Sequence, residues 1–203
     1  MATLRDDVFL GEANWYRQEV VQPVSYVCGF CGERVASDRG YPAGAMADGS
    51  GAHIAYIRIC PGCDGPTVFT RSEKQVPGPL PGGEVQHVPQ LLDQLFGEAR
   101  LSSSAGAYTA AVMVCRKMLM NIAVDKGAKA GLSFLDCVQY LADNGFVPPN
   151  GKGWVDYIRT RGNEATHEIH LMKQEDAIAL IRFVEMLLRF IYEFPQLVPA
   201  PPK

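Results

Sequence analysis

Two pairs of cysteines, each with two residues between its members, constrain the fold of this chain more than any other feature. Cys28-Gly-Phe-Cys31 and Cys60-Pro-Gly-Cys63 are separated by 28 residues in a chain of 203. In a CxxC loop both sulfurs can turn toward one point, and two such loops supply the four thiolates of a tetrahedral zinc site. We therefore expect one structural Zn²⁺ per chain, held by Cys28, Cys31, Cys60 and Cys63. Four thiolates leave no open position for catalysis by the metal.

The segments around these cysteines resemble short strands. Residues 24–28 and 53–60 lead into the two pairs, and residues 33–37 and 66–70 leave them. Gly32 directly follows the first pair and Gly65 comes two residues after the second, and both suit the left-handed turn that such a loop needs. The pattern predicts a β-rich zinc ribbon.

Two disulfides or a redox CxxC would be alternative uses of the same cysteines. No apolar signal segment is visible in the first 20 residues, so we expect a reducing, cytoplasmic environment that disfavours disulfides. A thioredoxin-like motif would need one pair in a βαβ context. His53 could replace a ligand, but four cysteines make it unnecessary. Cys115 and Cys137 lie in apolar helical patterns, where we expect them to be buried as small hydrophobic side chains.

The amino-acid composition changes along the chain and divides it into a β-rich part, a linker, a helical part and a tail. We expect a zinc ribbon with an N-terminal extension over residues 1–74 and a Pro/Gly linker over 75–87, where prolines remove backbone donors. A helical bundle should follow over 88–194, and the Pro-rich tail 195–203 should be disordered. The predicted fold class is thus α+β, with a small β-rich part followed by an all-α antiparallel bundle.

Apolar residues recur at helical spacing throughout the second part. Ser133 is a candidate N-cap, Gly127 and Gly145 are candidate helix stops, and Pro195 should terminate the last helix. The five predicted helices cover residues 88–103, 105–127, 132–145, 154–171 and 173–194.

Charge excludes some functions. Residues 1–83 carry 7 basic and 9 acidic side chains and the remainder carries 12 and 13, so neither part is a basic nucleic-acid-binding domain by bulk charge. Charged residues interrupt the most apolar helix, which argues against a membrane span, and we expect a soluble protein. A metabolic enzyme finds little support, because the chain has no Gly-rich phosphate loop, nucleophile elbow or metal-ligand histidine pair.

The segment RTRGNEATHEIH, residues 159–170, gathers Arg, Asn and His side chains. With about 100° per residue on a helix, Asn163, His167 and His170 lie within about 80° of Arg159, whereas Arg161 lies near about 200° on the same wheel and points away. Such a face suits metal-independent RNA cleavage. A neutral histidine can take the proton of a ribose 2′-OH, and an arginine can stabilise the charge on phosphorus. Alternatively, these side chains only hydrogen-bond within the bundle.

The order of these features resembles the bacterial and phage family called domain of unknown function 4145. The resemblance covers about residues 88–194 and depends on the "R…GN…H" signature with an arginine, here Arg116, in the second helix of the bundle. That family is similar to the wider HEPN superfamily of helical bundles, many of which are ribonucleases in toxin–antitoxin and antiphage systems. A zinc ribbon ahead of the bundle is also associated with the family.

This resemblance implies catalytic roles for Arg159, Arg161, Asn163 and His167, and a homodimer in which two motifs meet. The spacing in HEPN ribonucleases favours Arg161, which has five residues between it and His167. The narrower family instead favours Arg159, so the choice between the two arginines stays open. Met120 stands where the family tends to place an acidic residue. We therefore expect a ribonuclease of phage–host conflict or, alternatively, a non-catalytic dimeric adaptor that binds protein or nucleic acid.

Overall fold

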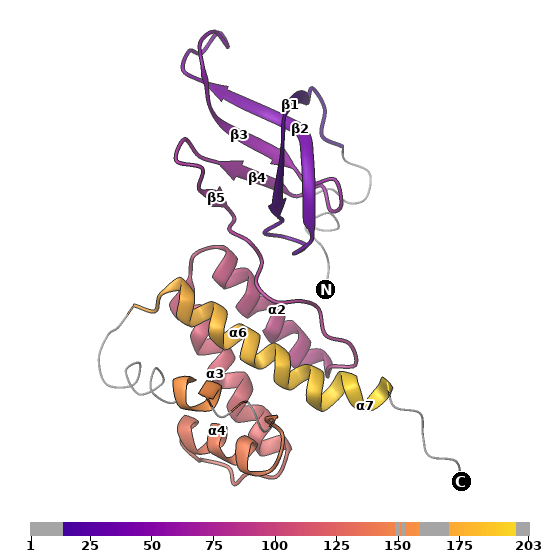
Figure 1. Ribbon diagram of the computed structural model, residues 1–203, viewed down its shortest axis with the longest axis vertical. Helices are drawn as coiled ribbons and strands as arrows, with labels where there is room; N and C mark the ends of the chain where they lie inside the picture. Colours follow the sequence, from indigo (N-terminus) through magenta and orange to yellow (C-terminus); the bar gives the residue numbers. More distant parts are fainter. Residues whose placement is uncertain (1–13, 149–150, 152, 159–170, 198–203) are drawn as a thin grey trace. The chain divides into compact units, whose positions relative to one another are not determined.

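The structure is a computed structural model that describes residues 14–148, 151, 153–158 and 171–197. The chain divides into two compact units. The sheet unit contains the residues up to Pro81 together with Ser104–Gly106, and the helical unit contains Gly82–Ser103 and the residues from Ala107 onward. The predicted fold class, a β-rich part followed by a helical part, is confirmed (Figure 1).

The sheet unit is an antiparallel meander in which strands follow one another in sequence order. Its strands are β1 (Glu19–Val27), β2 (Arg34–Gly44), β3 (His53–Ile59), β4 (Pro66–Phe69) and β5 (Gln75–Val76). Strand β2 changes partner at Gly40, which pairs with Glu19 of β1 on one side and Arg58 of β3 on the other. A Cβ atom on Gly40 would lie 2.1 Å from the carbonyl oxygen of Ile57, so only glycine permits this close approach of the strands.

A buried arginine connects the strands of this sheet. Arg58 in β3 is 3% exposed, and its Nη1 donates to the carbonyl oxygens of Gln22 at 2.7 Å and Ser37 at 3.0 Å. Its guanidinium carbon also lies 5.1 Å from the ring centre of Tyr56 and 5.7 Å from that of Phe69. Carbonyl groups and aromatic faces thus replace the water that this cation loses on burial.

Four of the five helices that the apolar periodicity predicts are present among the described residues. They are α2 (Gln90–Ser104), α3 (Tyr108–Asp125), α4 (Phe134–Asp143) and α6 (Gln174–Leu188). The Ser133 hydroxyl accepts the Asp136 amide at 3.2 Å, and Gly127 and Gly145 have the positive φ of helix stops, so these three predictions are confirmed. Of the predicted helix 154–171, residues 154–158 are helical and Leu171 is not, while 159–170 lie outside the described residues.

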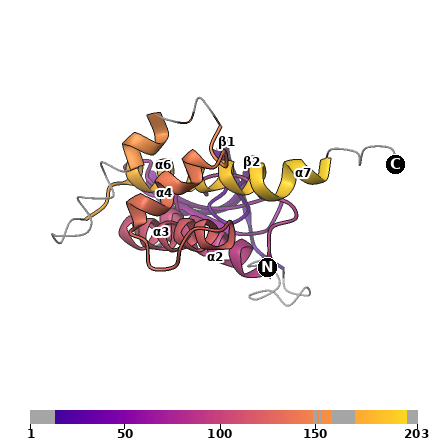
Figure 2. The same ribbon diagram turned by 90° about the horizontal axis from the view of Figure 1, so that it is seen from below.

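Helix α3 is the centre of the helical unit, because it packs against both α4 and α6 (Figures 1 and 2). The buried side chains of these helices meet in one hydrophobic core, to which α2 adds Leu92, Phe96 and Ala99. The largest fully buried side chains of this core are Phe96, Met118, Leu119, Ile122, Leu141, Ile181, Phe183, Leu187 and Leu188.

The prediction that Pro195 terminates the last helix is wrong. Helix α6 passes into a π-helical turn, η2 (Arg189–Glu193), and then into α7 (Phe194–Leu197), which contains Pro195. The Phe194 amide donates to the Arg189 carbonyl across the wider turn. Pro195 therefore lies within α7, directly after the π-helical turn. Residues 198–203 of the predicted tail lie outside the described part.

Part of the Pro/Gly segment 75–87 is held by other elements. Gln75–Val76 forms β5, and the Arg189 side chain donates to the Glu84 carbonyl at 2.8 Å. The Gln86 amide donates to the Glu193 carboxylate at 2.9 Å. The stretch 82–86 is therefore bound to the end of the last helix of the helical unit.

Within the described ranges, no helix combines the length and the apolar character that crossing a membrane would require.

Candidate metal centre

The two cysteine loops have the same backbone geometry. Each follows a strand directly, since Cys28 comes after β1 and Cys60 after β3. The Cys28 amide donates to the Glu33 carbonyl at 2.9 Å, and the Cys60 amide makes the equivalent bond to Gly65 at 3.0 Å. In each loop the amide two residues after the first cysteine also points at that sulfur, at 3.4 Å. Hydrogen bonds from backbone amides to sulfur stabilise the thiolate form, so the geometry of both loops suits thiolate ligands.

The left-handed residue of each loop comes directly after its second cysteine. Gly32 has φ 78° as expected, but in the second loop Asp64 takes this conformation, with φ 55°, and the prediction for Gly65 is wrong. Aspartate tolerates this region because its short polar side chain can bond locally. Gly65 is needed for another reason, since a Cβ there would lie 2.6 Å from the Phe30 ring.

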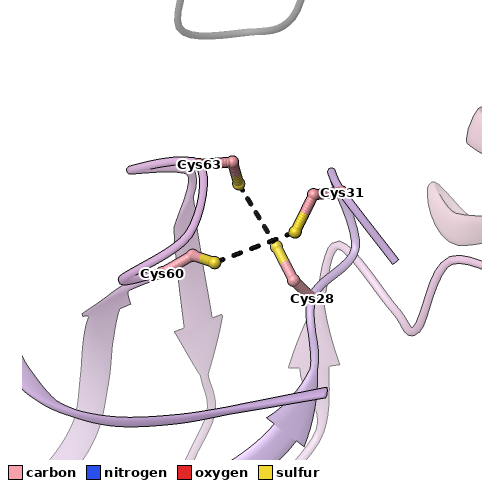
Figure 3. Close-up of side chains that lie close together, drawn as sticks. All are labelled: Cys28, Cys31, Cys60 and Cys63. Carbon is pink, nitrogen blue, oxygen red and sulfur yellow. Dashed lines mark hydrogen bonds between the residues drawn. The ribbon is translucent and has the colours of Figure 1, made fainter. Parts of the chain in front are cut away.

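The four sulfurs converge on one point (Figure 3). Cys28 Sγ lies 3.7 Å from Cys63 Sγ, Cys31 Sγ lies 3.9 Å from Cys60 Sγ, and all four fall within 4.8 Å of one another. A disulfide needs about 2.05 Å, so these are free cysteines. A tetrahedron with metal–sulfur bonds of about 2.3 Å has edges of about 3.8 Å. The sulfur positions therefore fit a tetrahedral metal ion.

Crowding of four thiols makes their ionisation interdependent. A hydrogen bond from Cys63, opposed by burial, lowers the pKa of Cys28 to about 5. Burial is the main cause that raises the pKa of Cys31 to about 11, and donation to Cys28 followed by burial raises the pKa of Cys63. Without a cation, the thiolate is favoured at Cys28 and disfavoured at Cys31 and Cys63. A divalent metal ion removes this conflict, because a coordinating thiol is deprotonated outright.

Aromatic side chains shield the inner side of this centre. Tyr26 is 5% exposed and packs against Cys28 and Cys60, with Phe69 at 5.2 Å in an edge-to-face arrangement. Burial, with the nearby cysteines, raises the pKa of Tyr26 to about 12. The dry surroundings on this side strengthen any bond between thiolates and a cation.

The other candidate ligands of the sequence stay away from this cluster. His53 is exposed at the start of β3, with its ring 5.9 Å from that of Tyr56, as expected for a surface histidine. Cys115 and Cys137 are buried in the core of the helical unit, and burial raises the pKa of both thiols, that of Cys115 to about 12. They are small core side chains, as predicted.

The predicted catalytic residues Arg159, Arg161, Asn163 and His167 lie outside the described residues. Ile158, which directly precedes this segment, and Met172, two residues after its end, both line one pocket of the helical unit. The same pocket is lined by Arg116 of α3. Described residues on both sides of the signature segment thus line the same pocket as this arginine.

Sequence reasoning missed several residues of this pocket. Phe134, Tyr157 and Asp176 line it together with Arg116, although they belong to three different segments. Tyr157 lies only two residues before the signature, which is a signal that could have singled it out. Nothing in the sequence pairs Arg116 with Phe134. Met120 packs against the hydrophobic core as a partly buried side chain.

The fold and the cysteine centre define a protein with a four-cysteine sheet unit joined to an α-helical unit. A family model described as domain of unknown function (DUF4145) matches residues 97–200, about half of the chain, and the protein belongs to this family. Searches of the curated proteins and of the solved structures give no match.

Proposed function

We propose that the four-cysteine centre binds one structural Zn²⁺ per chain. Two loops of equal geometry, sulfur spacings that match a tetrahedron and an all-sulfur ligand set support this metal. The coordination would be complete with four thiolates, so the ion would stabilise the sheet unit and would perform no chemistry. Cys28, Cys31, Cys60 and Cys63 are the ligands of this proposal.

We infer further that the protein is a HEPN-like, metal-independent ribonuclease. The observation that supports this proposal is that Ile158 and Met172, described residues on either side of the signature segment, line the pocket that Arg116 also lines. In this mechanism His167 takes the proton of a ribose 2′-OH, which then attacks the adjacent phosphorus and expels the 5′-oxygen. The departing 5′-oxygen takes up a proton from water, and the products are a 2′,3′-cyclic phosphate and a 5′-hydroxyl.

The remaining polar residues of the segment assist that step. Arg159 or Arg161 stabilises the negative charge that develops on the five-coordinate phosphorus, and Asn163 orients the reacting groups. Two copies of the chain would bring their signatures together in a homodimer. A monomeric mass by light scattering would refute this assembly. RNA of a phage or of its bacterial host is the substrate class that we propose, because the resemblance to HEPN ribonucleases implies a role in phage–host conflict.

A non-catalytic dimeric adaptor is the alternative function, and one observation favours it. Met120 follows Arg116 by one helical turn and packs against the core, at a position where the family tends to carry an acidic side chain. A polar site that lacks this group suits binding of protein or nucleic acid without cleavage.

One experiment distinguishes the ribonuclease from the adaptor. Purified protein is incubated with mixed RNA in EDTA too dilute to strip zinc, beside His167→Ala and the matched control His53→Ala, which removes an exposed histidine of the sheet unit. Cleavage by the wild type and by His53→Ala, but not by His167→Ala, would support the ribonuclease. If no protein cleaves RNA, or if His167→Ala cleaves as well as the wild type, the ribonuclease proposal fails.

A further inference from the structure

The first cysteine loop is in contact with the last residue of a helix. Ser104 ends α2 and belongs to the sheet unit. It is 7% exposed, and its hydroxyl oxygen lies 3.0 Å from the carbonyl oxygen of Gly29 and 2.9 Å from that of Gly78. The two carbonyl groups share the single proton of this hydroxyl. A polar side chain at a helix end thus bonds to the residue that directly follows Cys28.

This hydroxyl acts on the same peptide unit that bonds the Cys28 sulfur. Gly29 contributes the carbonyl of that peptide and Phe30 contributes its N–H, which donates to Cys28 Sγ at 3.4 Å. Because a peptide unit is planar, a donor that holds its carbonyl also fixes the direction of its N–H. Accepting a hydrogen bond at the oxygen polarises the peptide as well, which strengthens the N–H as a donor. Ser104 is therefore placed to orient and strengthen the bond to Cys28 Sγ.

A backbone bond holds Ser104 in the same place. Its carbonyl oxygen accepts the Gly78 amide at 2.7 Å. Carbonyl groups at the C-terminus of a helix have no partner within the helix, so this bond satisfies a group that would otherwise need water. Gly29 also approaches Gly78 closely, since a Cβ atom on Gly29 would lie 2.5 Å from the Gly78 carbonyl oxygen. The end of α2, the first cysteine loop and the segment after β5 thus meet at Ser104.

The second cysteine loop has different surroundings. Its Gly62 amide also donates to a sulfur, that of Cys60, at 3.4 Å. The carbonyl of that peptide belongs to Pro61, which is exposed, whereas the equivalent Gly29 is buried. The two loops therefore share an internal geometry but differ in what surrounds the peptide that bonds the sulfur.

We propose that Ser104 is a positioning residue of the metal centre, which acts on Cys28 through the Gly29–Phe30 peptide. This inference rests on the zinc site proposed above. Outer residues that hold the ligands of a metal commonly change its affinity when they are replaced. Because thermodynamic coupling between two sites is reciprocal, a helix end that favours metal binding is itself stabilised when the metal binds. Occupancy of the metal centre and order at the end of α2 are therefore linked.

The zinc affinity of the full-length protein tests this role. Competition with a chromophoric chelator is measured for the wild type, for Ser104→Ala and for the matched control Ser102→Ala, which removes a hydroxyl from the same last turn of α2. The net effect of one hydrogen bond corresponds to a change in affinity of about two- to twelvefold. The Kd for zinc should rise by this factor in Ser104→Ala and stay unchanged in Ser102→Ala. Equal affinities of Ser104→Ala and the wild type would overturn the proposal, as would an equal loss in the control.

A measurement on the unmodified chain decides the question if Ser104→Ala fails to fold. Amide hydrogen exchange along α2 is compared with zinc bound and after zinc is removed by a chelator. Because the coupling is reciprocal, amides of residues 101–107 should exchange at least about twofold faster without zinc. Residues 92–99, which contribute Leu92, Phe96 and Ala99 to the core of the helical unit, should keep their exchange rates. Unchanged exchange over 101–107 would refute the link between the metal centre and the end of α2.

Failure of this inference is distinguishable from failure of the zinc proposal. A wild-type protein that contains no zinc and takes up none on titration would remove both the zinc site and the role of Ser104. One zinc per chain, bound with the same affinity by the wild type and by Ser104→Ala, would leave the zinc site in place and overturn the role of Ser104 alone.

Discussion

Removal of the proposed Zn²⁺ should unfold the sheet unit and leave the helical unit folded. The reason lies in how little apolar surface the sheet unit buries around its cysteines. The cluster of buried residues at the centre consists of Tyr26, Cys28 and Cys60, and two of these three are the proposed ligands. The helical unit, by contrast, has a core of buried side chains from α2, α3, α4 and α6 that includes none of the four clustered cysteines.

The magnitudes agree with this expectation. A hydrophobic core in a domain of fewer than about 70–80 residues rarely supplies more than about 3–5 kcal/mol of stability. Structural zinc contributes about 10–16 kcal/mol in small zinc-binding peptides at pH 7. The larger of these contributions comes from the metal, so the sheet unit should not stay folded without it.

Hydrogen exchange of the intact chain, read by mass spectrometry on peptides, measures both units at once. A chelator at high concentration should release one Zn²⁺ per chain and abolish protection over residues 24–71, whereas peptides from α3 and α6 should keep their protection. Cys63→Ser should lose the metal and behave in the same way, and Cys137→Ala, which removes a core cysteine, should keep it. Protection of residues 24–71 without metal, or simultaneous loss in α3 and α6, would refute the reasoning.

Two further predictions concern the helical unit. Ile181→Ala creates a cavity in the core and should lower the free energy of unfolding of this unit by about 2–5 kcal/mol in urea titrations, whereas truncation of the exposed Met113 should cost less than about 0.5 kcal/mol; a change in metal content would contradict the independence of the units. Arg189→Met breaks hydrogen bonds to Glu193 and to the stretch 82–86, and should cost about 1 kcal/mol, since its side chain is 30% exposed. The Gln86 amide and Arg189 lower the pKa of Glu193, so this carboxylate stabilises the fold above its ordinary pKa, and the stabilisation disappears as the pH falls through the lowered value. The difference between wild type and Arg189→Met should therefore shrink on acidification, and a difference that grows would count against this network.

Local patterns predicted much of the fold and the four cysteines that cluster in the sheet unit. The cysteine spacing indicated the ligand set because a CxxC loop is a short-range geometry, and helix positions followed from apolar periodicity over successive turns. Ser133 could be recognised as a cap because its partner amide is three residues away. The error at Gly65 arose because either Asp64 or Gly65 could take the left-handed conformation of the second loop. The need for glycine at position 65 comes instead from its contact with the ring of Phe30, 35 residues earlier in the chain.

The sequence alone determined the four-cysteine set, the order of a β-rich part before a helical part, and the family to which the chain belongs. Tertiary structure decided which side chains from distant segments meet. Arg58 reaches carbonyl groups of two neighbouring strands, and Arg116 stacks on Phe134 of another helix. Such contacts depend on the packing of whole elements and leave no periodic trace in the sequence. The sequence likewise gives no signal for the position of Pro195 inside α7, which depends on the π-helical turn Arg189–Glu193 directly before this helix.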